Sequence, residues 1–153
     1  MSAFSDAGDA IVQFLDSQTF SLSLSTQRKN NPYSILNSTN ELTCTVFPNV
    51  RSLNRDTRGD FERGLQIGVA VHKLVEADTE EAALAEEDSI MDVMEEVEEA
   101  LATQQVFGNA QLESFDEDAG VRAALNEAML QQSIFSAITL LNLRIEPYAW
   151  RAL

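Results

Sequence analysis

The sequence predicts an α+β fold, in which a mostly antiparallel sheet of about four strands packs against an N-terminal helix and a long acidic amphipathic helix. Apolar residues alternate with polar or small ones in four segments, as in strands, and recur every three or four residues in two others, as in helices. The chain has 153 residues, of which 44% are hydrophobic. This size and composition are those of one folded domain, residues 1–153.

A short helix is predicted near the N-terminus. Ser5 and Asp6 are of the residue types that accept hydrogen bonds from the free backbone N–H groups at the start of a helix. Apolar residues follow at helical spacing, so one side of this helix is expected to face the core. They are Ala7, Ala10, Ile11, Phe14 and Leu15.

Two strands are predicted in the next part of the chain. Residues 20–25 alternate Phe or Leu with Ser, and residues 42–46 alternate Leu, Cys and Val with Thr. A polar, turn-rich loop, residues 27–40, separates them. The second strand is expected to stop at Pro48, because proline has no N–H group to donate to a ladder. Residues 49–62 are then a polar loop.

Two further strands are predicted to lie inside the sheet. Residues 65–72 alternate large apolar side chains with mostly small ones, the pattern of a central strand. Residues 134–145 are apolar on both faces, which also favours a central strand, although periodicity alone allows a helix there. Residues 108–120 show no clear pattern, and residues 121–130 fit either a short helix or an extended lead-in.

The long helix concentrates the negative charge of the chain. Between Asp78 and Glu99 there are eleven carboxylates and no basic residue. Apolar residues recur among them at spacings of three and four, which predicts a buried stripe beneath a strongly anionic outer face. Asp78 or Thr79 is the expected N-cap. The expected stripe consists of Leu84, Ile90, Val93, Met94, Val97 and Leu101.

The net charge of −15 and the sequence pI near 4.2 restrict the possible partners. Nonspecific DNA binding depends on Lys and Arg, so the composition disfavours DNA as a ligand, although it allows DNA as a neighbour. No segment has the length of an apolar membrane span, and the N-terminus lacks the pattern of a secretory signal. With Cys44 as its only cysteine, the chain is expected to be a soluble protein of a reducing cytoplasm.

Catalytic chemistry finds little support in the sequence. Cys44 and His72 form the only thiol and imidazole pair, and no third group to orient them is apparent, so a structural role is preferred. Residues 116–120 with Glu127 fail as an EF-hand loop because the glycine falls at the wrong position. The carboxylates of the long helix are expected to be solvated, not held in an apolar cleft. We therefore predict a protein that is not an enzyme, with no catalytic residue, cofactor or metal.

Two groups of charged residues are candidate interaction sites. The acidic helix face is interpreted as a plain solvated surface, a surface for a basic partner, or a repulsive wall past which DNA slides. A loop of mixed charge is predicted as a subunit or partner interface, with a solvated, mobile loop as the alternative. The acidic face includes Glu87, Asp92, Glu95, Glu96 and Glu99, and the loop carries Arg51, Arg55, Arg58 and Asp60.

Three segments carry a family resemblance through their order and spacing. They are residues 42–48 with the following loop up to Arg58, residues 65–71, and residues 135–144, with the acidic helix between the second and the third. This pattern resembles the tail terminator, or tail completion, proteins of long-tailed bacteriophages. The chain departs from it by its unusually acidic helix and by the diffuse region at residues 108–130.

The resemblance implies a virion structural protein that forms a ring, usually of six subunits, at the head-proximal end of the tail tube. Such a ring ends tube growth and joins the tail to the neck. The implied partners are further copies of the chain, the tail tube protein and a neck or head-completion protein, with assembly in the host cytoplasm. DNA passes through the ring without specific binding, and no membrane is involved. The alternatives are another head–tail connector or minor tail protein, or an acidic protein-binding module.

Overall fold

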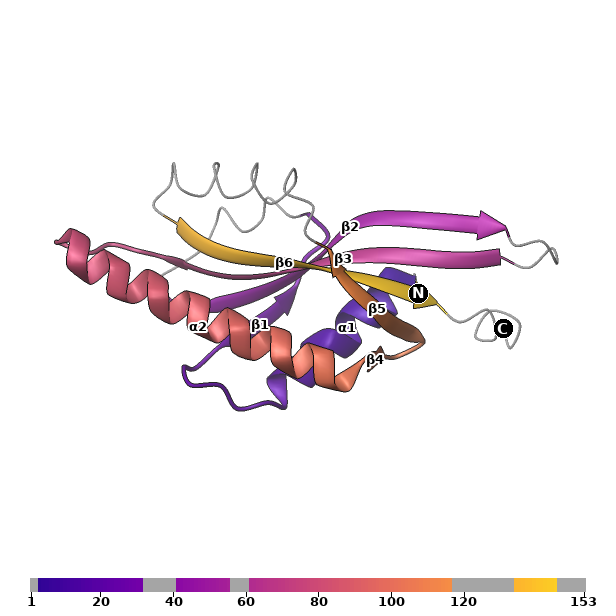
Figure 1. Ribbon diagram of the computed structural model, residues 1–153, viewed down its shortest axis with the longest axis horizontal. Coiled ribbons are helices and arrows are strands. Elements are labelled where there is room, and N and C mark those ends of the chain that lie inside the picture. Colours follow the sequence, from indigo (N-terminus) through magenta and orange to yellow (C-terminus); the bar gives the residue numbers. More distant parts are fainter. Residues whose placement is uncertain (1–2, 32–40, 56–60, 117–133, 146–153) are drawn as a thin grey trace.

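The computed structural model describes residues 3–31, 41–55, 61–116 and 134–145, with the backbone alone for residues 50–55, 61–63 and 116. These residues form two helices and one six-stranded sheet of order β1-β2-β3-β6-β5-β4 (Figure 1). β1 is parallel to β2, and every other neighbouring pair is antiparallel. The elements are α1 (Ala3–Asp16), β1 (Ser25–Arg28), β2 (Thr43–Arg55), β3 (Phe61–Leu74), α2 (Glu80–Gln104), β4 (Val106–Phe107), β5 (Ala110–Asp116) and β6 (Ile134–Ile145).

The predicted α+β class and the mostly antiparallel sheet are confirmed, but the sheet has six strands where about four were expected. β3 and β6 are the two central strands, paired along almost their whole length from Leu74↔Ile134 to Arg63↔Ile145. Apolar residues of both strands are buried in two separate clusters, which accounts for the apolar pattern.

The prediction that the second strand stops at Pro48 is wrong. β2 runs on to Arg55 and pairs with β3 throughout, with an irregularity between Pro48 and Val50 that leaves Asn49 out of register. The backbone of Val46 faces β1, since its carbonyl accepts from Lys29 N at 2.9 Å. Pro48 therefore turns its nitrogen to the same side, beyond the last β1 pair, where no donor is needed.

Two predictions about the outer strands are also wrong. Residues 20–24 alternate but are not a strand, and the first strand is β1, at Ser25–Arg28. Residues 106–116 form the β4–β5 hairpin, which turns at Gly108 with a φ of 63°, although no pattern was found from residue 108 onward. A bulge between Leu112 and Ser114 breaks the alternation of β5, so Leu112 and Phe115, on either side of the bulge, are three positions apart and not two.

Helix α1 begins at Ala3, so the expected cap residues Ser5 and Asp6 lie in its first turn. On the side of α1 that faces the sheet, the ring of Phe14 packs edge-on against the ring of Phe107 of β4, with 5.9 Å between the ring centroids. Arg28 of β1 holds the outer side, donating from Nε to Asp9 Oδ1 at 2.8 Å. α1 thus contacts both edge strands of the sheet, β1 and β4.

Helix α2 is capped by Thr79, whose Oγ1 accepts from Ala82 N at 3.1 Å; this decides between the two expected caps. The residue after the helix, Gln105, is its C-cap and has a left-handed φ of 62°. Ile90, Val93, Met94, Val97 and Leu101 form the buried stripe as predicted. Leu84, expected in the same stripe, is instead 53% exposed.

The two helices lie on the same face of the sheet, here called the helix-side face, and pack into one core with it (Figure 1). The opposite face, here called the far face, has a smaller buried cluster: Phe47, Ala70, Ile134, Ile138 and Leu140. On the far face the ring of Phe47 lies directly over Gly68, where a Cβ atom would clash with it.

Candidate functional site

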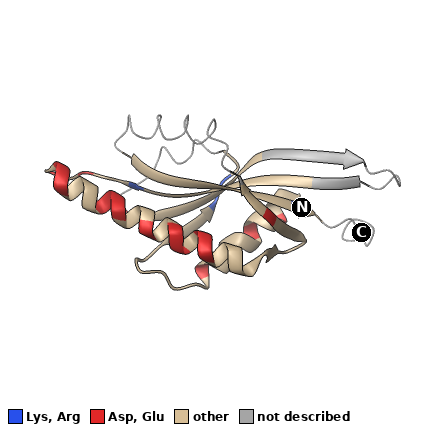
Figure 2. Cartoon of the chain, viewed as in Figure 1, with Lys and Arg blue, Asp and Glu red and all other residues tan. Residues whose placement is uncertain are grey.

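The acidic helix α2 runs along one side of the molecule, and its carboxylates are spread over its whole length (Figure 2). Of the predicted face, Asp92, Glu95 and Glu99 are exposed and Glu87 is partly buried. Like charges this close repel one another, so the surface favours any partner that brings positive charge and disfavours phosphate backbones.

Glu96 differs from the rest of the predicted acidic face, because its carboxylate is occupied within the protein. Its Oε1 accepts from Ser21 N at 3.0 Å, and its Oε2 accepts from Ser21 Oγ at 2.6 Å. The two bonds tie the α1–β1 connection to the flank of α2. They also explain why residues 20–24 are not a strand: the backbone N–H of Ser21 is bonded to a helix side chain and not to a neighbouring strand.

A second contact joins α2 to the sheet. Lys73 Nζ near the end of β3 lies 3.8 Å from Glu86 Oε1, and both side chains are partly exposed. At this distance and exposure the pair adds little to stability. Lys73 nevertheless brings a positive charge to the edge of the acidic helix.

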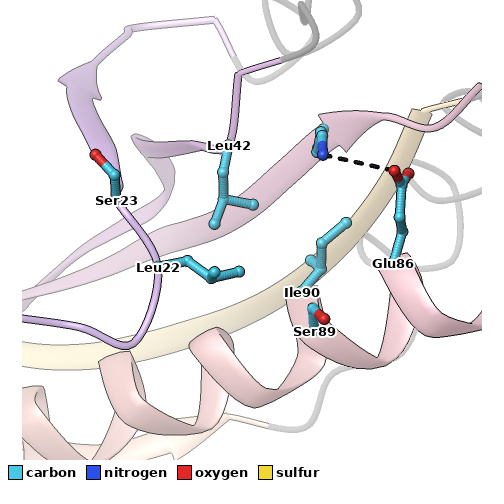
Figure 3. A pocket seen from close by; sticks show the side chains of 7 residues that line it. Leu22, Ser23, Leu42, Glu86, Ser89 and Ile90 are labelled. Carbon is cyan, nitrogen blue, oxygen red and sulfur yellow. Dashed lines mark ion pairs between the residues drawn. The ribbon is translucent and has the colours of Figure 1, made fainter.

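Between these two contacts is a pocket of about 270 Å³ (Figure 3). Leu22, Leu42 and Ile90 form its apolar wall, with Leu22 and Leu42 pointing toward the helix. Ser23, Ser89, Lys73 and Glu86 complete the lining. Sequence reasoning missed this site, because it is assembled from four segments that only tertiary packing brings together. We call it the α2 pocket.

The predicted arginine loop is an extended hairpin arm for most of its length. Arg51 and Arg55 belong to β2, where they are paired in register with Leu65 and Phe61. Arg58 and Asp60 lie outside the described residues. The prediction of a loop is therefore wrong for residues 49–55, because the sheet register with β3 continues past the bulge at Asn49.

Cys44 and His72 do not form a nucleophilic pair. Cys44 lies in the helix-side core, whereas His72 is on the far face, where its Nε2 is 2.8 Å from Thr45 Oγ1. Burial, with a smaller contribution from Asp16, raises the pKa of the Cys44 thiol to about 12. Burial lowers the pKa of His72 to about 4. Neither group is set up to exchange protons near neutral pH.

A polar ladder crosses four strands on the far face. Asn49 Nδ2 donates to Gln66 Oε1, Gln66 Nε2 donates to Asn142 Oδ1 at 3.1 Å, and Asn142 Nδ2 donates to Ser114 Oγ at 3.0 Å. The ladder joins the irregular position of β2 to the bulged position of β5. These side-chain bonds between neighbouring strands help to hold the register of the central strands.

Within the part of the chain that the structure describes, no group of three or more His, Cys, Asp or Glu side chains is placed to hold a metal ion. The calcium-loop residues beyond Asp116 lie outside that part. Neither described helix has the length and apolar character needed to cross a membrane.

No protein-family model matches the chain, and a search of curated proteins gives no relative.

Proposed function

We propose that this protein is a virion structural subunit that forms a ring at the head-proximal end of a phage tail tube, ends tube growth and joins the tail to the neck. The observation that carries the proposal is the arrangement of the three segments of the resemblance. They belong to β2, β3 and β6, three adjacent strands of the sheet. A pattern read along the chain thus corresponds to one continuous structural unit.

The sheet edges provide the means of assembly in this proposal. β1 covers β2 only from Thr43 to Val46, so among the described residues the outer edge of β2 has no partner strand from Phe47 to Arg55. At the other end, among the described residues, β4 pairs with β5 only at Ala110 and Gln111, and Leu112 N donates to Gln105 O next to them. Unpaired edges are templates for strands of another chain, and a closed ring requires two different surfaces on each subunit.

The charge distribution supports the same proposal. Arg51, Arg55, Arg58 and Asp60 are assigned to the contact between subunits or with the tail; of these, Arg51 and Arg55 belong to β2. Asp92 and Glu99, both exposed, are assigned to a surface that DNA passes without binding, since repulsion of phosphates keeps the channel free. The number of subunits in the ring is proposed as six.

An acidic protein-binding module is the second candidate, and one observation favours it. Asp92, Glu95 and Glu99 are exposed together on one helix, which suits a basic partner. Binding of this kind weakens steeply with salt, because exposed charges are screened over about 3 Å at 1 M ionic strength. A head–tail connector or minor tail protein with a related sheet is the remaining alternative.

Native mass spectrometry and negative-stain microscopy of the purified protein test the ring, and isolated tail tubes test the capping. We expect closed rings at high protein concentration and tubes whose growth stops where the protein is bound. A protein that stays monomeric and leaves tubes open would overturn the proposal. Capture of a basic protein that is lost by about 0.5 M salt, without rings, would support the binding module.

A further inference from the structure

Two apolar features on opposite flanks of α2 are left unexplained by the packing within one copy. The first is the α2 pocket, at whose mouth Leu22 is 44% exposed. The second is a pair of large side chains on the outer flank, Leu84 at 53% and Met91 at 46% exposure. We call this pair the α2 knob. Both side chains leave much of their apolar surface uncovered within one copy.

The positions of pocket and knob follow from helical geometry. Leu84 and Met91 are seven residues apart, which is about two turns, so they lie on one face about 10 Å apart along the axis. Ser89, in the pocket lining, is two residues from Met91 and is therefore about 200° away around the helix. The helix thus carries a projection on one side and a depression on the other.

Charge decides which surface the knob fits. Glu87, Asp88 and Glu95 lie three or four residues from Leu84 or Met91 and so surround the knob. Two knobs facing each other across a two-fold axis would bring these carboxylates together, and like charges in contact cost several kcal/mol in an interface. The pocket instead offers Lys73, whose pair with Glu86 is loose at 3.8 Å. Because Lys73 and Glu86 balance each other in the pocket lining, the acidic border of the knob meets less like charge there than at a second knob.

We infer that the α2 knob of one copy inserts into the α2 pocket of the next copy, so that neighbouring subunits are joined head to tail through α2. The inference rests on the proposed ring and names one of its contacts. Met91 fills the space between Leu22, Leu42 and Ile90, and Leu84 covers the exposed part of Leu22. A projection and a depression on different sides of one molecule generate a ring when the rotation closes.

Disulfide trapping tests the contact. The variant Ser23→Cys/Met91→Cys places one thiol at the pocket and one at the knob, and mild oxidation is expected to yield a ladder of covalent oligomers that ends at the ring number. Cys44 does not interfere, because it is fully buried. The matched control Ser23→Cys/Thr103→Cys has its second thiol at an exposed position of the same helix, about 18 Å from Met91. It is expected to give no ladder.

Single variants separate the outcomes. A mixture of Ser23→Cys and Met91→Cys proteins is expected to give covalent dimers, whereas Met91→Cys alone is not; dimers of Met91→Cys alone would overturn the inference in favour of a two-fold contact. If the untreated protein forms rings but the double variant gives no ladder, the inference is wrong and the proposed function stands. If the untreated protein is a monomer, both are wrong.

A charge in the knob provides a second readout. Met91→Asp is expected to raise the protein concentration needed for ring formation by about tenfold or more, as for removal of a central interface anchor. Its melting temperature as a monomer is expected to be unchanged, since Met91 is exposed in one copy. Unchanged ring formation by Met91→Asp would contradict the inference.

Discussion

Glu96 and Ser21 are joined by two hydrogen bonds that engage both carboxylate oxygens, at 3.0 Å and 2.6 Å. The residues are 75 positions apart in the chain, so the bonds define a tertiary contact and not a local turn. Ser21 precedes Leu22 and Ser23, which line the α2 pocket. The contact therefore sets the position of one pocket wall relative to the helix.

Replacing Glu96 with Gln is expected to lower the free energy of unfolding by about 1 kcal/mol, because a charged acceptor of two bonds becomes a neutral one with a single acceptor oxygen. Urea denaturation measures the change. Glu99→Gln is the matched control: it removes an exposed carboxylate of the same helix and is expected to stay within about 0.5 kcal/mol of the parent. Equal effects of the two substitutions would show that the Ser21 contact contributes nothing.

Acidification is expected to destabilise the fold through His72. Burial lowers its pKa to about 4 from the ordinary value of 6.5, so between these values the unfolded chain binds a proton that the folded protein excludes. The contribution of His72 to the free energy of unfolding is fully present above pH 6.5 and is lost as the pH falls towards 4. Between pH 6.5 and 5 the loss is expected to be about 1 to 2 kcal/mol.

The variant His72→Gln isolates this effect, because an amide can still bond to Thr45 but does not titrate. Chemical denaturation at pH 6.5 and pH 5 measures the difference for both proteins. The pH dependence of the variant should be smaller than that of the parent by the amount given above. Identical pH profiles would mean that His72 is not held neutral by burial.

Gly68→Ala is expected to destabilise the protein by about 1 to 3 kcal/mol, as for other overpacked sites. A Cβ atom at this position would clash with the ring of Phe47, which is itself fully buried and cannot simply move aside. The double variant Gly68→Ala/Phe47→Leu makes room for the methyl group. It should be less destabilised than the sum of the two single changes, and additive effects in a double-mutant cycle would contradict the close contact.

Thr79→Ala is expected to cost about 1 kcal/mol, because its Oγ1 accepts the hydrogen bond of Ala82 N at the start of α2. Thr79→Ser retains the acceptor and should remain close to the parent. Asp78→Ala is the informative comparison, since Asp78 was an equal candidate for the cap in the sequence. Thermal unfolding measures both variants. A lower melting temperature for Asp78→Ala than for Thr79→Ala would show that the helix is capped one residue earlier.

The elements that the sequence predicts well are those whose own residues carry the signal. β3, β6 and the buried stripe of α2 are each long enough to show a period, and each has large apolar residues at the positions that face a core. Leu84 fits the same spacing only approximately, and the structure places it on the outer flank. The acidic surface could be predicted for the same reason, since the carboxylates are adjacent in the sequence.

The outer strands and the contact site could not be predicted in this way. The bulge between Leu112 and Ser114 hides the alternation of β5, and the serine and leucine repeat at residues 20–24 imitates a strand. Whether an edge segment becomes a strand depends on the neighbour available to it, which is a property of the folded sheet. The α2 pocket, built from four distant segments, has no counterpart in any local pattern.

The sequence by itself determined the α+β class, the two central strands, the long helix and the concentration of negative charge along it, because periodicity and charge are properties of neighbouring residues. Tertiary structure alone decided that Glu96 binds Ser21, that Cys44 and His72 lie on opposite faces, and that β2 continues past Pro48. These outcomes depend on which segments meet in space. Hydrogen bonds and register between distant strands decide that, and no local pattern encodes it.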